Sequence, residues 1–231
     1  YALVFPAVFG DFFQSSCDYG CNFIISSFFR MLRYACFILA IILPGYYVAI
    51  EAFHPRLIPY KLAVSIAASR LGTPFNINIE IIIMILAFFV LIQASLQVSR
   101  SIGGTISIVG GLVLGDAAIT AGIVSPAVIV VVATAAICSM AIPNKEVNAV
   151  TWLFQLICVL FAAIFGLIGI IITLLLLFFL LAKLEPLGVP YLSPYTSTKP
   201  LQLEDSFIRF PDSLIKNRPL YLDPKNKRRK Q

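Results

Sequence analysis

The sequence has little charge. Charged residues make up 12% of its 231 residues, against about 25% in a soluble domain, and hydrophobic residues make up 60%, against about 45–50%. A soluble domain of this size could not cover its surface with so few charges. The composition therefore argues against a disordered chain, a disulfide-stapled secreted module and an ordinary cytosolic enzyme. It indicates an integral membrane protein.

The residue types that carry catalysis or bind metals are also scarce. His54 is the only histidine and has no second ligand beside it, so we expect a structural role and no metal site. No nucleophile motif surrounds any serine, and the apolar stretches hold no paired carboxylates or phosphate-binding loop. We therefore expect no enzymatic activity and no cofactor. The five cysteines are expected to be free thiols: Cys17, Cys21, Cys36, Cys138 and Cys158.

Four long uncharged stretches are present, at 34–50, 81–99, 117–144 and 147–182. A bilayer core of about 30 Å is crossed by roughly 20 helical residues, so these stretches predict about four spans. Helix is the required form, because unpaired backbone groups cannot face lipid. The predicted fold class is therefore all-α, a polytopic helical membrane protein.

The last uncharged stretch is too long for one simple span. Its 36 residues would extend about 54 Å as a helix, so it either tilts and projects or breaks near Gly166 and Gly169. We predict one long helix, because Phe165 and Leu167 lack turn chemistry.

Residues 51–79 are expected to lie at the membrane surface. Pro55 and Pro59 prevent a continuous helix at the start, and Pro74 interrupts the end. Between them, residues 61–70 are expected to form a short amphipathic helix in contact with lipid.

The basic residues predict orientation and domain boundaries. Of 17 Lys and Arg, ten follow Ala182, so residues 183–231 read as a basic cytoplasmic tail that stays solvated or touches an anionic leaflet. Both termini are then cytoplasmic. No folded module accompanies the basic run, so we expect no nucleic-acid binding. Residues 28–182 form the expected transmembrane domain, and residues 1–27 the linker from a soluble domain upstream.

Small residues recur every three or four positions between residues 101 and 122. On a helix they would form a single stripe that lets another helix approach closely in lipid. A broken or re-entrant helix is equally compatible, because glycine weakens a helix by about 1 kcal/mol relative to alanine. The stripe consists of Gly103, Ser107, Gly111, Gly115, Ala118 and Gly122, and Ile102, Ile106, Val109 and Val113 lie opposite.

Asp116 is a charged residue between two apolar runs. A charge at mid-membrane costs about 2.5–3.5 kcal/mol, so Asp116 should face protein or water. It would either attract cations in a pore or cap the amides of a following helix. Thr120, Gln93 and Gln97 are polar neighbours that would line the same cavity or bond across helices.

Several motifs together resemble the GerA family of spore germination proteins, the A subunits of nutrient germinant receptors. The similarity runs from about residue 28 to the end of the chain. The matching stretches are LPGYYVAIEAFHPRLIP (43–59), Ser69-Arg70 followed by Thr73-Pro74-Phe75, SIGGTISIVGGLVLGDAAITAGIVSP (101–126), GVPYLSP (188–194) and IRFPDSLIKNRP (208–219).

This resemblance implies a receptor subunit in the inner membrane of bacterial spores. Such A subunits work with a transporter-like B subunit, to which nutrient binding is mainly assigned, and a lipoprotein C subunit. They are thought to form a homo-oligomeric channel that releases monovalent cations when it opens. On this basis we expect a ligand-gated cation channel subunit.

The chain departs from the family pattern in its charges. It has LIQAS at 91–95 where an LREAG-like run is usual, and Ile85 and Phe89 stand at positions that are often acidic. Gly115-Asp116 and Thr120 replace the usual GQ…E pattern, while Glu80 remains. A non-conducting scaffold subunit therefore stays an alternative. So does a secondary transporter, although no second copy of the glycine-rich segment is present.

Overall fold

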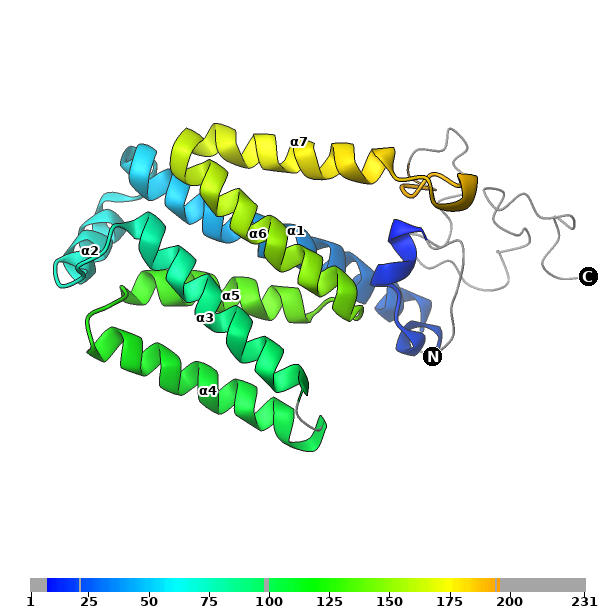
Figure 1. Cartoon of the computed structure of the whole chain (residues 1–231), viewed down its shortest axis with the longest axis horizontal. Helices are drawn as coiled ribbons and strands as arrows, with labels where there is room; N and C mark the ends of the chain where they lie inside the picture. Colours follow the sequence, from blue (N-terminus) through cyan, green and yellow to red (C-terminus); the bar gives the residue numbers. More distant parts are fainter. Residues whose placement is uncertain (1–7, 21, 98–99, 194, 196–231) are drawn as a thin grey trace, which may run out of the picture. The chain divides into compact units, whose positions relative to one another are not determined.

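The protein folds into helices joined by short turns. A computed structural model describes residues 8–20, 22–97, 100–193 and 195, and these contain no β-strand. The all-α prediction is therefore confirmed. Figure 1 shows the α-helices, which are α1 (Phe23–Phe53), α2 (Tyr60–Arg70), α3 (Ile77–Gln97), α4 (Arg100–Thr120), α5 (Pro126–Met140), α6 (Lys145–Phe165) and α7 (Leu167–Lys183). Short 3₁₀ helices are η1 (Phe9–Phe13), η2 (Ser16–Tyr19), η3 (Pro55–Leu57) and η4 (Pro186–Gly188).

The chain divides into two compact units. Unit 1 comprises residues 1–37, 141–148 and 175–231, and unit 2 comprises residues 38–140 and 149–174. The described part of unit 1 holds the 3₁₀ segments η1, η2 and η4 and the first turns of α1. Unit 2 holds the whole of α2, α3, α4 and α5.

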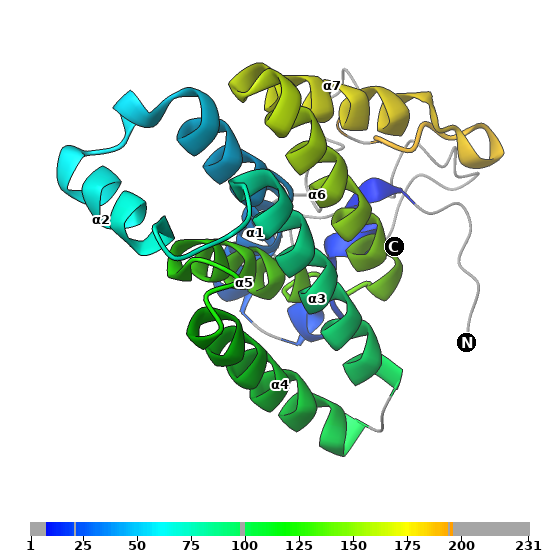
Figure 2. The same ribbon diagram turned by 60° about the vertical axis from the view of Figure 1, so that its left-hand side comes forward.

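In unit 2, α3 packs against both α4 and α5, as Figures 1 and 2 show. Its buried face carries Ile81, Met84 and Ile85, which are at most 2% exposed, and α5 contributes Val128 and Val132 to the same core. These positions recur at the three- and four-residue spacing of one helical face, which explains why the segment folds as a helix with a single buried side.

A glycine cap ends α4. The Gly122 N–H donates to the Ile119 carbonyl at 2.9 Å, and the Ile123 N–H donates to the Ala118 carbonyl at 3.1 Å. This pair of bonds is the Schellman motif, which requires a left-handed residue after the helix, and Gly122 supplies it with φ of +65°. Gly122 therefore lies beyond the helix that carries the other members of the small-residue stripe.

The prediction of one helix across residues 147–182 is wrong. The chain reverses between α6 and α7 at Gly166, whose φ of +62° lies in the left-handed region that side chains avoid. The Gly166 N–H donates to the Ala162 carbonyl at 2.9 Å, which gives one of the last carbonyls of α6 a partner. A single glycine makes the turn, and the flanking residues need no turn propensity.

Gly169 lets the two arms of this hairpin touch. A Cβ atom at this position would collide with the backbone of Phe161 and Ala162, so no larger residue fits without a shift. A second close approach occurs between α1 and α6, where a Cβ on Gly45 would lie 2.7 Å from the Cys158 sulfur. Both contacts place helix backbones nearer to one another than side chains would allow.

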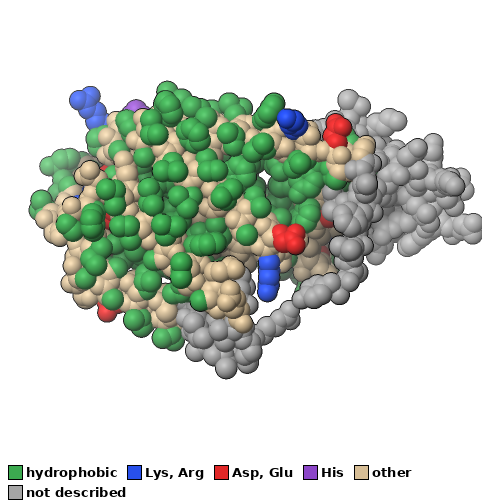
Figure 3. Space-filling model, viewed as in Figure 1, with side chains coloured by type: hydrophobic (Ala, Val, Ile, Leu, Met, Phe, Trp, Pro, Cys, Tyr) green, Lys and Arg blue, Asp and Glu red, His purple; other side chains and the backbone are tan. Residues whose placement is uncertain are grey.

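The candidate membrane spans number three among the described residues. Phe23–Phe53, Ile77–Ser95 and Lys145–Phe165 are long and apolar enough to cross a bilayer, whereas α5 and α7 are shorter apolar helices. The 15 residues of α5 would extend about 22 Å, less than a hydrocarbon core. The expected total of about four spans therefore stays a prediction. Figure 3 shows hydrophobic side chains over most of the visible face, as expected for a surface in lipid.

The helix expected between the prolines of residues 51–79 is present as α2. It begins directly after Pro59 and ends at Arg70, and none of its residues is buried. Leu62 and Val64 are exposed on it. Contact of this helix with a membrane surface remains a prediction.

Gly169→Ala should destabilise the protein, because its methyl group would meet the Phe161 backbone, which cannot move aside as a side chain can. Overpacking of this kind costs about 1–3 kcal/mol, so thermal unfolding in detergent should occur several degrees below the wild-type temperature. Gly72→Ala is the matched control, because no atom lies within 4 Å of its added Cβ. Equal unfolding temperatures for both variants would contradict the close contact.

Candidate functional site

The outward face of α4 carries Asp116. Its side chains recur three and four residues apart, so they share one side of the helix. Asp116 lies near the middle of this face, and the other polar member, Thr120, donates to the Asp116 backbone carbonyl at 2.9 Å. The exposed residues of the face are Val109, Leu112, Val113, Asp116, Ile119 and Thr120. Asp116 lies inside α4 near its end, so it does not cap the amides of a following helix.

Gly111 and Gly115 of the small-residue stripe form a glycine edge on α4, and this edge faces α3 and α5 in unit 2. A Cβ on Gly111 would lie 3.9 Å from the Phe88 ring, and one on Gly115 would lie 3.6 Å from Ile129. Gly110 is tighter, at 2.8 Å from Leu91. The edge therefore supports packing against α3 and α5 within one chain. Ala118 is half-buried, and Gly103 and Ser107 belong to the first turns of α4, whose side chains lie outside the described ones.

Gln93 and Gln97 are exposed on α3 and do not join Asp116 and Thr120. The contacts of Gly110 with Leu91 and of Gly111 with Phe88 show that α3 and α4 run antiparallel. Gln93 and Gln97 therefore lie level with the first half of α4, whereas Asp116 lies near its end. The stripe and these four polar residues remain predictions as functional groups.

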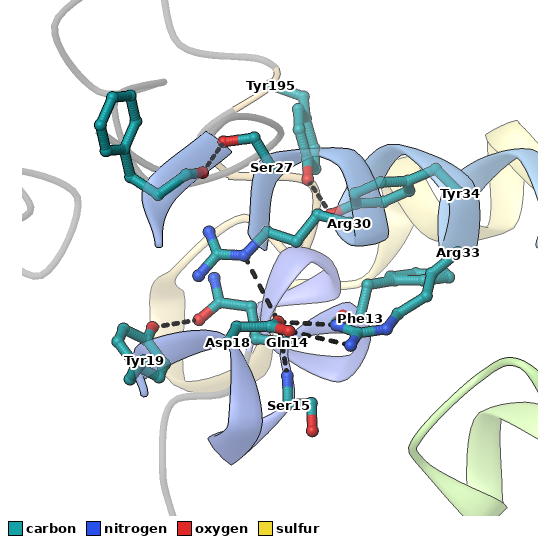
Figure 4. A network of polar contacts seen from close by, with 11 residues as sticks. Phe13, Gln14, Ser15, Asp18, Tyr19, Ser27, Arg30, Arg33, Tyr34 and Tyr195 are labelled. Atoms are coloured by element: carbon teal, nitrogen blue, oxygen red, sulfur yellow. Dashed lines mark hydrogen bonds and ion pairs between the residues drawn. The ribbon is translucent and has the colours of Figure 1, made fainter. Parts of the chain in front are cut away.

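A buried ion-pair network joins the segment before α1 to its first turns, as Figure 4 shows. Asp18 is 3% exposed and accepts hydrogen bonds from both terminal nitrogens of Arg33, at 2.6 and 2.9 Å. The Ser15 N–H donates to the same carboxylate at 3.0 Å, and the Arg30 Nε lies 3.6 Å away. Arg33 also donates to the Phe13 carbonyl at 2.9 Å. The bidentate pair fixes this segment on α1.

The C-terminal segment reaches the same turns of α1. The Tyr34 and Tyr195 hydroxyls lie 2.6 Å apart in a hydrogen bond, and the Phe13 ring stacks on Tyr34 with centroids 4.4 Å apart. The Phe9 N–H donates to the Tyr191 carbonyl at 2.9 Å. Residues on both sides of the helical region are thus held together within unit 1.

In unit 2, a second ion pair borders an open cavity. Arg70 at the end of α2 donates to Glu51 of α1 at 2.5 Å, and both side chains are mostly buried. The cavity has a volume of about 380 Å³. Its other walls are apolar and come from Pro55, Ile58, Ala63, Ile66, Ala67 and Leu71.

A third polar contact is fully buried in unit 2. Glu80, in the first turn of α3, accepts a hydrogen bond from the N–H of Ser125, which directly precedes α5. Both residues are 0% exposed. Within the described part of the chain, the other Glu80 oxygen and the Ser125 hydroxyl have no hydrogen-bond partner. A carboxylate from one helix thus occupies the amino end of another.

Sequence reasoning missed these three contacts because their partners are distant in the chain. Asp18 and Arg33 are 15 positions apart, Glu51 and Arg70 are 19 apart, and Glu80 and Ser125 are 45 apart. The sequence did contain one signal for these contacts, which is that charged residues are rare in its apolar stretches. An acid within or beside an apolar stretch needs a partner, which makes each such residue a candidate for an interior contact.

The histidine and the cysteines form no metal centre in the described ranges, where no group of three His, Cys, Asp or Glu side chains could hold an ion. His54 is exposed beside η3 and lines a cavity of about 580 Å³ with Phe53 and Arg56. Cys17, Cys36, Cys138 and Cys158 are not joined in disulfides, in agreement with the prediction of thiols. Cys21 lies outside the described residues.

The described residues form an all-α protein with three helices long and apolar enough to span a membrane and with a few buried or partly buried ion pairs. The chain belongs to the GerA family, because the model described as Bacillus/Clostridium GerA spore germination protein matches residues 1–221. The resemblance seen in the motifs is thereby confirmed.

Curated relatives agree with this assignment. Spore germination protein GerLA of Bacillus cereus is 39% identical over 98% of the chain, and spore germination protein KA of Bacillus subtilis is 38% identical over 95%. The uncharacterised membrane protein YfkQ of B. subtilis is 35% identical over 95%. The chain spans 46%, 40% and 43% of these three relatives, respectively. No solved structure matches it.

Asp18→Asn should weaken unit 1, because it leaves Arg33 without its carboxylate. Removing one partner of a buried pair costs roughly 3 kcal/mol, so the unfolding temperature should fall by several degrees. Glu185→Gln, an exposed acid in the same unit, is the control and should have little effect.

The same pair predicts acid sensitivity. Burial raises the pKa of the Asp18 carboxyl, but the Arg33 and Ser15 hydrogen bonds and the charges of Arg33 and Arg30 outweigh burial and hold it below 3.8. A lowered pKa means that the stabilisation is present above about pH 4 and is lost as the pH falls through the folded-state value. The wild type should therefore lose more stability below pH 4 than Asp18→Asn does, and parallel pH curves would refute this assignment.

Proposed function

We propose that this chain is the membrane part of an A subunit of a spore germinant receptor. Its membership of the GerA family and its similarity to named spore germination proteins support this role. In this proposal it lies in the spore inner membrane with both termini on the core side. It works there with a transporter-like B subunit and a lipoprotein C subunit. The role includes no catalytic step.

The proposed mechanism is opening of an oligomeric cation channel in response to a nutrient. The observation that carries it is the position of Asp116 on the exposed face of α4, which is aliphatic apart from Asp116 and Thr120. If this face met lipid, the charge would cost about 2.5–3.5 kcal/mol. A ring of equivalent α4 helices around water removes this cost and gathers negative charge where cations pass.

The glycine edge has a supporting role in this arrangement. Close packing of Gly111 and Gly115 against α3 and α5 holds one side of α4. The opposite side, with Asp116 and Thr120, is then available to line a pore.

A non-conducting scaffold is the second candidate. Ile85, at a position that is often acidic in the family, is 0% exposed in the core of unit 2, so an acid is replaced by an apolar core residue. A subunit that only supports its partners would need no charge there. Ion flux through the purified protein in vesicles separates the two roles.

Asp116→Asn should lower cation selectivity without preventing assembly, because it removes the charge and preserves the side-chain volume. In reconstituted vesicles, the cation-to-anion permeability ratio should fall several-fold while oligomer size stays constant. Glu146→Gln removes an exposed acid at the start of α6 and serves as the control. Unchanged selectivity in Asp116→Asn would remove this residue from the pore wall, and absence of flux in the wild type would favour the scaffold.

Gly111→Leu should disrupt oligomer formation, because a branched side chain would push α4 away from Phe88 and displace its outward face. Gly111→Ala is the matched control, since its single Cβ fits at 3.9 Å from that ring. Native mass measurement in detergent compares the two variants. Normal oligomers with leucine would show that assembly does not depend on this edge.

A further inference from the structure

Glu80 is a buried acid that forms no ion pair with a described Lys or Arg. Its side chain is 0% exposed. An isolated carboxylate is costly to bury unless a positive group accompanies it.

The neighbouring charges do not supply that positive group. Arg70 is already paired with Glu51 at 2.5 Å. No ion pair joins Arg70 to Glu80 among the described residues.

The two oxygens of the Glu80 carboxyl group have different surroundings. The Ser125 N–H donates to one carboxylate oxygen, and that oxygen lies at the amino end of α5, where the helix dipole is positive. The second Glu80 oxygen and the Ser125 hydroxyl are both buried and unpartnered among the described atoms. They belong to residues already joined by a hydrogen bond, so they can approach one ion together.

We propose that Glu80 and Ser125 bind an alkali-metal ion, Na⁺ or K⁺, inside unit 2. Oxygen atoms are the ligands that hard cations prefer. A single carboxylate with a hydroxyl suits one positive charge, and the described residues offer no group of three acids, His or Cys for a divalent metal. The site lies within one chain and does not depend on conduction or on oligomer formation.

The test compares thermal unfolding of the full chain in detergent with NaCl, KCl or choline chloride, at one pH and one ionic strength. Choline screens charge to the same extent but is too large for the site. A difference between the unfolding curves in alkali-metal salt and in choline chloride would therefore report a bound alkali ion. We expect Na⁺ or K⁺ to raise the wild-type unfolding temperature by about 2–4 °C in a saturable way. Glu80→Gln should lose this increment, and Glu146→Gln should keep it.

Ser125→Ala provides a second variant in case Glu80→Gln does not fold. It removes the hydroxyl ligand but retains the backbone N–H that bonds to Glu80, so the ion concentration needed for half of the effect should rise several-fold. Equal unfolding temperatures in Na⁺, K⁺ and choline would overturn the proposal. So would an unaltered ion response in Ser125→Ala, or stability that follows pH but not the identity of the cation.

Discussion

An acid that is buried between the helices of this chain needs a hydrogen-bond or ion-pair partner, because an isolated charge is costly to bury. The structure meets this constraint differently at each acid. Asp18 has two arginines and an N–H donor, and Glu51 has Arg70. Glu80 has the Ser125 N–H at the amino end of α5 but no ion pair with a described Lys or Arg. Asp116 has no such enclosure and stands on an exposed helical face. The acids with partners secure the fold, and the acid without an enclosed site supports the proposed pore.

Glycines allow the helices to reach these partners. Gly122 and Gly166 each supply a left-handed residue where the chain reverses, and Gly45 and Gly169 remove the side chain where two helices come close. The first two glycines are needed for their backbone conformation, and the other two for the space that a side chain would occupy. In lipid, where hydrophobic burial does not draw helices together, such contacts carry much of the packing energy.

The sequence was sufficient to predict the helical class, the helix at 60–70 and the family, because composition, proline spacing and motifs are local signals. It was insufficient at Gly166, because the neighbours Phe165 and Leu167 lack turn propensity and one glycine in a left-handed conformation makes the reversal alone. The partners of Asp18, Glu51 and Glu80 could not be predicted, since they depend on which distant segments meet. The periodicity of the small-residue stripe could be recognised in the sequence, but its contacts with α3 and α5 could not be predicted from it.

The hydrogen bond between Phe9 and Tyr191 determines where labels can be placed on the protein. It holds the segment before α1 next to the segment after α7, both within unit 1. Paired reporters attached near Phe9 and Tyr191 would, by the same geometry, sit close enough for efficient energy transfer.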